Sequence, residues 1–220
     1  MLTQVYEAAT PDDARRMCEI GLDHVGLIIG SGEYPRELPF DQAREIAAEI
    51  KGPSKFLALF MSSNVDFIAD WVARLKAPVL HLGAHADKIT PADVASLKRQ
   101  LPNTKLMRSI PMTGEESIEI ARSYENIADF LLLDSIAANG QFGALGVTHD
   151  WNVSRKIVEQ VKTPVILAGG LHPGNVAEAI RKVRPFGVDS FSKTNRNDGS
   201  FRKDFDLVRR FHEEARAALG

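Results

Sequence analysis

Eight short apolar runs recur along the chain, and the stretches between them carry apolar residues at helical spacing. One such stretch places Ala14, Met17, Cys18 and Gly21 at i, i+3, i+4 and i+7, the spacing of a buried helix face. Strands that alternate with helices predict a parallel sheet, whose strands are apolar because both faces are buried. The runs cover Leu2–Tyr6, His24–Ile29, Lys55–Phe60, Pro78–Leu82, Lys105–Ile110, Phe130–Leu133, Pro164–Ala168 and Gly187–Phe191.

The number of runs limits the architecture, because 220 residues leave only about 27 for each strand–helix unit. Eight units in so short a chain favour a compact (β/α)8 TIM barrel over an open, doubly wound sheet. No linker rich in Pro, Ser or Gly divides the sequence. We therefore expect residues 1–220 to form a single α/β barrel domain.

Composition excludes several classes of partner. The chain has 27 Lys and Arg against 29 Asp and Glu, a net charge of −2, which argues against wrapping nucleic acid. The longest apolar run, Phe56–Met61, is far shorter than the roughly 18 residues of a membrane span. The N-terminus lacks a signal-peptide pattern, and the one cysteine, Cys18, fits a reducing compartment. We expect a cytoplasmic protein, a monomer or homodimer, that binds a small molecule.

Two strand ends carry residues suited to binding phosphate. Gly169 and Gly170 follow the seventh run and come shortly before a helix start, where unpaired backbone N–H groups attract anions. Ser192, Lys193 and Thr194 follow the eighth run, and phosphate sites in such barrels commonly use these two loops together. The alternatives are a tight turn that needs glycine and a surface lysine, or a lysine that forms a Schiff base with a carbonyl substrate.

Asp134 stands at the end of the sixth apolar run. Partial burial there would raise its pKa and favour a role as general acid, whereas the alternative is a helix cap or a loop salt bridge. The segment from Ile136 to Thr148 contains Gly140, Gly143 and Gly146 and does not resemble a helix start. It is predicted to be a mobile loop over the site.

Several motifs then occur in a specific order. From about Phe130 to Phe211 the chain resembles the phosphoribosylanthranilate isomerase family of tryptophan biosynthesis, and the likeness is thinner before that. The motifs that carry the resemblance are Leu132-Leu133-Asp134-Ser135, Thr148-His149-Asp150-Trp151, Leu167-Ala168-Gly169-Gly170-Leu171 with Asn175-Val176, and Val183-Arg184-Pro185-Phe186-Gly187-Val188-Asp189, preceded by Thr10-Pro11-Asp12-Asp13-Ala14, Gly26-Leu27-Ile28 and Tyr34-Pro35-Arg36.

The resemblance implies a (β/α)8 barrel that catalyses an Amadori rearrangement, in which an aminoaldose phosphate becomes an aminoketose phosphate. An acid protonates the ring oxygen to open the furanose, and a base removes the proton from C2. The family's acid matches Asp134, and its phosphate site matches Gly169, Gly170 and the loop 192–194. Its arginine for the anthranilate carboxylate matches Arg36, because a guanidinium suits a carboxylate. No cofactor or metal is implied.

The chain departs from the family at the base. The family's cysteine and the glycine after it correspond, without gaps, to Tyr6 and Glu7. Tyr6 has an ordinary pKa near 10 and is a poor base, so Glu7 is the candidate catalytic base if it points inward; otherwise it is a solvated strand-end glutamate. Cys18 is expected in a helix core. His81, shifted by two positions from the family's histidine, is expected to face the barrel interior as a base, a substrate contact or a core residue.

Three hypotheses follow. The chain is a phosphoribosylanthranilate isomerase with an unusual base, or a diverged isomerase, epimerase or aldolase of another sugar phosphate, or a non-catalytic phosphosugar-binding paralogue. The loss of the cysteine argues against the first, and the retention of Asp134 argues against the third. Fold alone does not choose among them, because barrels host many chemistries.

Overall fold

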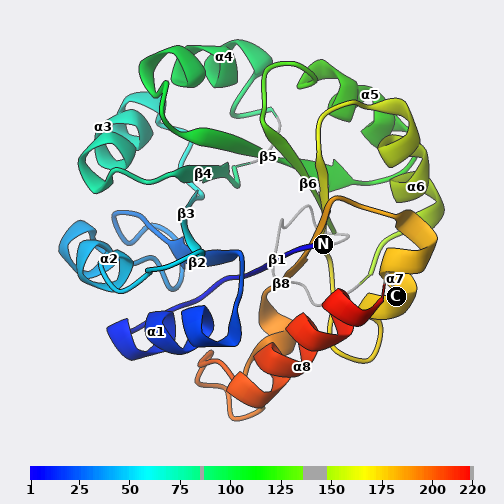
Figure 1. Ribbon diagram of the computed structural model, residues 1–220. Helices are drawn as coiled ribbons and strands as arrows, with labels where there is room; N and C mark the ends of the chain where they lie inside the picture. The colour runs from blue at the N-terminus through cyan, green and yellow to red at the C-terminus, as the bar shows by residue number, and fades with distance from the viewer. Residues whose placement is uncertain (85–86, 136–147, 219–220) are drawn as a thin grey trace.

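Eight parallel strands close into a barrel in the order of the sequence, with β8 pairing back onto β1 (Figure 1). The computed structural model describes residues 1–84, 87–135 and 148–218, and it confirms the predicted (β/α)8 barrel. The strands are β1 (Leu2–Val5), β2 (His24–Ile28), β3 (Lys55–Phe60), β4 (Val79–Leu82), β5 (Lys105–Met112), β6 (Phe130–Ser135), β7 (Val165–Leu167) and β8 (Gly187–Ser190).

Helices follow the strands and surround the barrel (Figure 1). Polar residues cap two of the helix starts: the Thr10 hydroxyl accepts a hydrogen bond from the backbone N–H of Asp13, and Thr90 and Asp93 form a reciprocal capping box. The helices are α1 (Pro11–Ile20), α2 (Phe40–Ala47), α3 (Val65–Leu75), α4 (Pro91–Gln100), α5 (Glu116–Ser123), α6 (Trp151–Gln160), α7 (Val176–Val183) and α8 (Phe205–Ala217), with a short 3₁₀ helix, η1 (Ser192–Thr194), before α8.

Two strands run past their apolar sequence. The sequence predicts strands that end at Ile110 and Leu133, whereas β5 and β6 continue together through the pairs Pro111–Asp134 and Met112–Ser135. Hydrogen bonding between these neighbours therefore extends β6 over its polar end. Asp134 consequently belongs to the rigid wall of the barrel rather than to the loop after it.

Side chains alternate between two apolar layers. One layer lies between the strands and the helices and includes Val25, Leu80 and Leu131. The other fills the barrel interior, as in other closed barrels of eight strands. Its buried members are Tyr6, Ile28, Leu57, Leu59, Val79, Met107, Leu132, Ile166 and Ala168.

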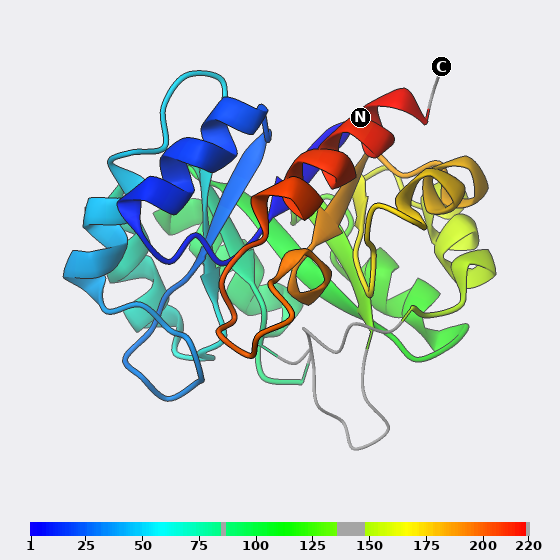
Figure 2. The same cartoon turned by 90° about the horizontal axis from the view of Figure 1, so that it is seen from below.

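The loops after β2 and β8 project from the same end of the barrel, the end where parallel strands finish (Figure 2). Barrel enzymes build their sites at this end. Residues 136–147, which hold Gly140, Gly143 and Gly146 of the predicted mobile loop, lie outside the described residues. Among the helices that the structure describes, none combines the length and the apolar character that crossing a membrane requires.

Candidate active site

Asp134 lies at the end of β6 on the inward-facing side of the strand. Leu132, two residues earlier on the same face, belongs to the apolar cluster inside the barrel. Burial raises the pKa of the Asp134 carboxyl from 3.8 to about 6, although the backbone N–H of Ser135 donates a hydrogen bond to Oδ1 at 2.8 Å. A carboxyl group with this pKa is protonated in a substantial fraction of molecules near pH 6, which suits a proton donor.

A chain of polar side chains crosses the barrel interior from β2 to β8. Nε2 of Gln4 donates to Oδ1 of Asp189 at 3.1 Å, and Oε1 of Gln4 lies 3.1 Å from Nδ1 of His24. Burial and the charge of Asp134 raise the pKa of Asp189 to about 8, and burial lowers the pKa of His24 to about 4. Both groups are therefore largely uncharged at neutral pH, which avoids the cost of burying two ions.

Tyr6 continues this chain toward β4 and β5. Its hydroxyl oxygen lies 2.5 Å from Nδ1 of His81, and Nε2 of His81 lies 2.6 Å from Oγ of Ser109. Burial, together with the charges of Asp189 and Asp134, raises the pKa of Tyr6 well above 10. Burial and the nearby Arg108 lower the pKa of His81 to about 3. His81 faces the interior as expected, but a neutral phenol and a neutral imidazole of low pKa make a poor base.

Gly26 makes room for the Tyr6 ring. A Cβ atom at position 26 would lie 2.2 Å from Cδ1 and 2.6 Å from Cε1 of Tyr6, closer than real Cβ contacts come. A glycine inside a strand often marks the close approach of another group. The tyrosine at position 6 and the glycine in β2 therefore form one packing unit.

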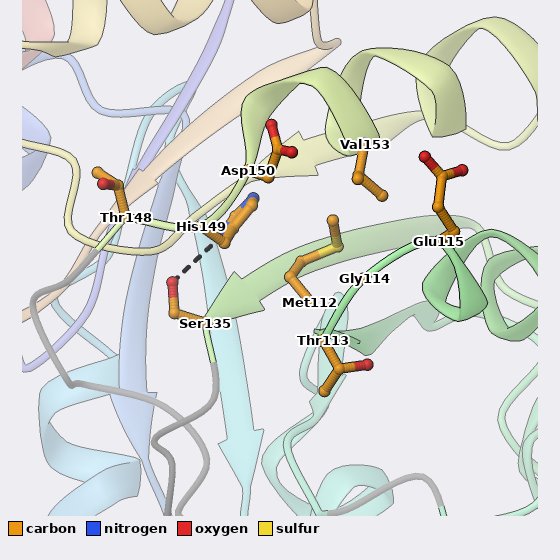
Figure 3. A pocket seen from close by; sticks show the side chains of 9 residues that line it. All are labelled: Met112, Thr113, Gly114, Glu115, Ser135, Thr148, His149, Asp150 and Val153. Atoms are coloured by element: carbon orange, nitrogen blue, oxygen red, sulfur yellow. Dashed lines mark hydrogen bonds between the residues drawn. The ribbon is translucent and has the colours of Figure 1, made fainter.

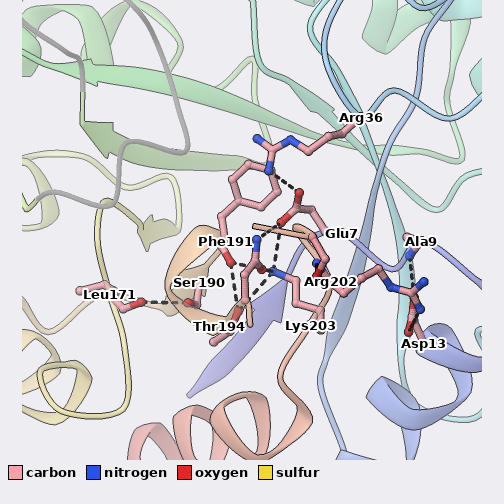
Figure 4. A network of polar contacts seen from close by, with 12 residues as sticks. Glu7, Ala9, Asp13, Arg36, Leu171, Ser190, Phe191, Thr194, Arg202 and Lys203 are labelled. Atoms are coloured by element: carbon pink, nitrogen blue, oxygen red, sulfur yellow. Dashed lines mark hydrogen bonds and ion pairs between the residues drawn. The ribbon is translucent and has the colours of Figure 1, made fainter. Parts of the chain in front are cut away.

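Glu7 follows β1 in a left-handed conformation, with φ of +66°, which favours glycine. This agrees with the glycine that the resemblance places here. The carboxylate is buried and accepts hydrogen bonds from three donors (Figure 4). Nη1 of Arg36 contacts Oε1, while Asn195 Nδ2 and Lys203 Nζ contact Oε2 at 2.8 and 3.3 Å.

Lys203 is a buried cation that holds the loop after β8. Besides Glu7, its ammonium group contacts the carbonyl oxygen of Phe191 at 2.6 Å and Oδ1 of Asn195 at 2.5 Å. Burial lowers the pKa of Lys203 to about 8, against the opposing effect of Glu7. The remaining partner is the Thr194 hydroxyl, at 3.3 Å. The loop is thus fixed from inside by one side chain.

The two loops of the predicted phosphate site lie together. The Ser190 hydroxyl donates to the carbonyl oxygen of Leu171 at 2.8 Å and links them (Figure 4). Within the described residues, no hydrogen bond engages the backbone N–H groups of Gly170, Ser192 and Lys193, so they are donors available to an anion.

The other members of this predicted set differ in their surroundings. Gly169 and Gly170 have φ of +80° and +64°, which explains why glycine stands at both positions. Lys193 is exposed. Thr194 is buried and its hydroxyl donates to the carbonyl oxygen of Phe191 at 3.1 Å, so it acts within the loop.

A cavity of about 470 Å³ lies beside this corner, between the ends of β5 and β6 and the start of α6 (Figure 3). His149 lies in its wall, with Nδ1 3.2 Å from Ser135 Oγ and Nε2 2.8 Å from Ser154 Oγ. Burial lowers the pKa of His149 to about 4. A Cβ atom on Gly169 would lie 2.4 Å from Ser135 Oγ, so the cavity and the glycine loop share a wall.

The structure therefore brings together Glu7 and Arg36 at one side of the barrel mouth, and places Gly169 beside the end of β6 that carries Asp134. His81 is separate, because both of its ring nitrogens are engaged by Tyr6 and Ser109.

Three residues near this site were not among the predicted site residues: Asp189, Asn195 and Lys203. Asp189 alternates with Gly187 and Phe191 along β8, a pattern that identifies an inward carboxyl. Asn195 and Lys203 had no such signal, because they act across a loop.

Within residues 1–84, 87–135 and 148–218, no cluster of three or more His, Cys, Asp or Glu side chains is arranged to hold a metal ion.

The family model for N-(5'-phosphoribosyl)anthranilate (PRA) isomerase matches residues 3–214. This chain belongs to that family. It is 38% identical over 213 residues to N-(5'-phosphoribosyl)anthranilate isomerase of Methanocella arvoryzae, covering 97% of each chain. Phosphoribosyl anthranilate isomerase of Thermococcus kodakaraensis has a similar structure, with a TM-score of 0.77 and 28% identity over 98% of this chain and 99% of that one.

A further solved structure of a phosphoribosyl anthranilate isomerase, in complex with reduced 1-(o-carboxyphenylamino)-1-deoxyribulose 5-phosphate, has a TM-score of 0.79 at 22% identity, over 98% of both chains. PRA isomerase is an aldose–ketose isomerase of tryptophan biosynthesis. The family, the fold and the isomerase class predicted from the sequence are therefore confirmed.

Proposed function

We propose that the chain isomerises an N-substituted 5-phosphoribosylamine by an Amadori rearrangement, with Asp134 as the general acid. The observation that carries this proposal is the inward position of Asp134 at the end of β6, with a pKa of about 6. A proton donor with a pKa near the working pH is the most effective acid. Protonation of the furanose ring oxygen by Asp134 opens the ring and gives a protonated imine.

The phosphate group of the substrate binds in the corner made by Gly169, Gly170 and the loop 192–194. Support comes from the backbone N–H groups of Gly170, Ser192 and Lys193, which no described group engages. The ammonium group of Lys193 adds a positive charge at the exposed edge. A substrate anchored there lies beside Ser135, the residue that follows Asp134, since Gly169 approaches Ser135 closely.

Glu7 is our proposed acceptor of the C2 proton. A carboxylate offers about four lone-pair directions, and Arg36, Asn195 and Lys203 donate to Glu7, which leaves one direction for a proton. The Tyr6 phenol does not serve, because its pKa is raised well above 10. His81 is given no substrate contact, because Tyr6 and Ser109 engage both of its ring nitrogens, whereas Arg36 is proposed to lie beside the amine part of the substrate.

Turnover assays test these roles. Purified protein is expected to convert an aminoaldose phosphate to the aminoketose phosphate, and Asp134→Asn and Glu7→Gln are each expected to lower kcat by roughly 10²–10⁴-fold. If each of the two variants keeps a kcat within about tenfold of the wild-type value, the assignment is contradicted.

Binding without turnover is the second candidate, and one observation favours it. The side chain at the position of the family's cysteine is a neutral phenol held by His81. In that case the wild type binds sugar phosphates without converting them, and the double variant Tyr6→Cys/Glu7→Gly gains isomerase activity. An active wild type excludes this candidate.

A further inference from the structure

We infer that Phe201 is a specificity-determining residue, which recognises an aromatic ring on the amine substituent by stacking against it beside Arg36. The inference rests on the proposed function, because it concerns the substrate of that same site. It starts from the guanidinium carbon of Arg36, which lies 4.7 Å from the ring centroid of Phe201 and 5.0 Å from that of Phe191, the ring beside it in Figure 4.

The charges around Arg36 attract an acidic substituent. Arg36 and Lys203 share the single carboxylate of Glu7, so one negative charge faces two positive charges. Arg202, on the same loop as Lys203, pairs with Asp13, which leaves this sum unchanged. The cluster therefore keeps a net positive charge and draws a substituent that carries a carboxylate toward Arg36. A ring that bears this carboxylate then lies next to the guanidinium group and the phenyl rings around it.

Phe201 offers open aromatic surface to such a ring. It is 58% exposed, and Tyr34, two residues before Arg36 in the sequence, is 41% exposed. Only one other large apolar residue in the described part of the chain is exposed: Phe186, which precedes β8 at the opposite end of the barrel. Exposed aromatic surface rimmed by polar groups is typical of a ligand-binding groove. The exposed rings of this chain thus lie mainly where the substituent is expected.

The backbone at Phe201 has a conformation that a bulky residue rarely adopts. Its φ is +56°, in the left-handed region that favours glycine. Neighbouring hydrogen bonds hold it there: the backbone N–H of Arg196 donates to the carbonyl oxygen of Arg202 at 2.8 Å, and the N–H of Arg202 donates to the Ser200 hydroxyl at 3.2 Å. Strained residues of this kind cluster at sites that clamp ligands. Neither burial nor the backbone favours a phenylalanine at this position, whereas a stacking role explains it.

The segment that carries Phe201 is anchored on both sides. Asn195 and Lys203 pair as an antiparallel bridge, and the ammonium group of Lys203 is buried. Nη2 of Arg202, the residue after Phe201, contacts both carboxylate oxygens of Asp13, at 3.0 and 3.1 Å. A ring that is held in place before the ligand arrives loses little freedom on binding, so its contact contributes more to affinity.

Two ligands separate the aromatic ring from the rest of the substrate. One is reduced 1-(o-carboxyphenylamino)-1-deoxyribulose 5-phosphate. The other has a 2-carboxyethyl group in place of the o-carboxyphenyl group, which keeps the number of bonds between the nitrogen and the carboxylate. Titration calorimetry measures both dissociation constants for the wild type, Phe201→Ala and Phe201→Tyr. The control is Phe186→Ala, which removes an exposed ring from the opposite end of the barrel. Because the two amines differ in basicity, the ratio of the two constants is compared between each variant and the wild type.

Phe201→Ala is expected to bind the aromatic compound roughly tenfold more weakly and the ring-free compound within about twofold of the wild type, because only the stacking contact is lost. Phe201→Tyr keeps a ring, so it and the control are expected to retain the wild-type ratio. If Phe201→Ala leaves the ratio unchanged, whether it weakens both compounds or neither, the inference is overturned while the proposed function stands. If the wild type binds neither compound more tightly than inorganic phosphate, the proposed function fails, and the inference with it.

Discussion

At the scale of single residues, the chain has a hydrogen-bonded ring, that of Tyr6, where the resemblance expects a cysteine. Tyr6 fills the space over Gly26, donates to or accepts from His81, and closes a polar chain that reaches Asp189 through Gln4. Buried polar networks are stable only when every member has a partner. The position that the resemblance assigns to the family's base thus belongs to the barrel interior, and Asp134 stands where the resemblance expects the acid.

The packing of Tyr6 against Gly26 gives a double-mutant cycle. Gly26→Ala places a methyl group inside the Tyr6 ring, so we expect a loss of about 1–3 kcal/mol in the free energy of unfolding. In a Tyr6→Cys background the same substitution is expected to cost less than about 0.5 kcal/mol, because the ring is gone. Urea unfolding of the four proteins measures both costs. Equal costs in the two backgrounds would show that the ring is not the obstacle.

At the scale of elements, the strands are the part of the fold that the sequence predicts best. Compact apolar runs such as Lys55–Phe60 predicted β3 to the residue. The ends of β5 and β6 were missed, because pairing between neighbours rather than apolar sequence extends them. Alternation along β4 placed His81 in the interior.

The candidate site was predictable only in part. Strand ends locate Asp134 and the glycine pair, since parallel strands finish at one end of the barrel. The partners of Glu7 come from loops after β2 and β8, which lie 29 and 196 residues away in sequence for Arg36 and Lys203. Contacts of that kind depend on loop conformation, for which the sequence has no periodic signal.

Lys203 is the residue that fixes the loop after β8, so replacing it tests how much the anchoring of this loop contributes to stability. Lys203→Met removes one donor from the carbonyl oxygen of Phe191 and leaves the buried carboxylate of Glu7 with one cation fewer, so we expect a loss of about 3 kcal/mol in the free energy of unfolding. Lys193→Met, ten residues earlier and exposed, is expected to change it by less than about 0.5 kcal/mol. Equal effects in urea unfolding would refute the role given to Lys203.

At the scale of the whole molecule, buried ionisable groups make stability depend on pH. The pKa values of His24, His81 and His149 are lowered to about 4, 3 and 4, so the unfolded chain binds more protons below pH 6.5 and stability rises with pH there. Asp189 acts in the opposite direction, since its pKa is raised from 3.8 to about 8. Its favourable contribution is fully present below pH 3.8 and is lost as pH rises to 8.

Asp189→Asn isolates that contribution. Asparagine keeps an acceptor for Gln4 Nε2 and does not ionise, so the variant should gain stability relative to the wild type as pH rises from 5 to 8. We expect a relative gain of at least about 1 kcal/mol, or roughly 2–4 °C in Tm for a chain of this size. Thermal unfolding at several pH values measures the difference. A difference that is constant over this range would contradict the raised pKa of Asp189.

The acid role of Asp134 is tested most directly by the pH dependence of kcat/KM. The substrates are phosphoribosylanthranilate and the corresponding compound without the carboxyl group, and the proteins are the wild type and Asp134→Asn. Since the pKa of Asp134 is about 6 and the protonated form donates, wild-type kcat/KM should fall above pH 6, approaching tenfold per pH unit. Asp134→Asn should be roughly 10²–10⁴-fold slower and lose that dependence. A variant that stays within tenfold of the wild type, or a wild type that turns over neither compound, would contradict the account.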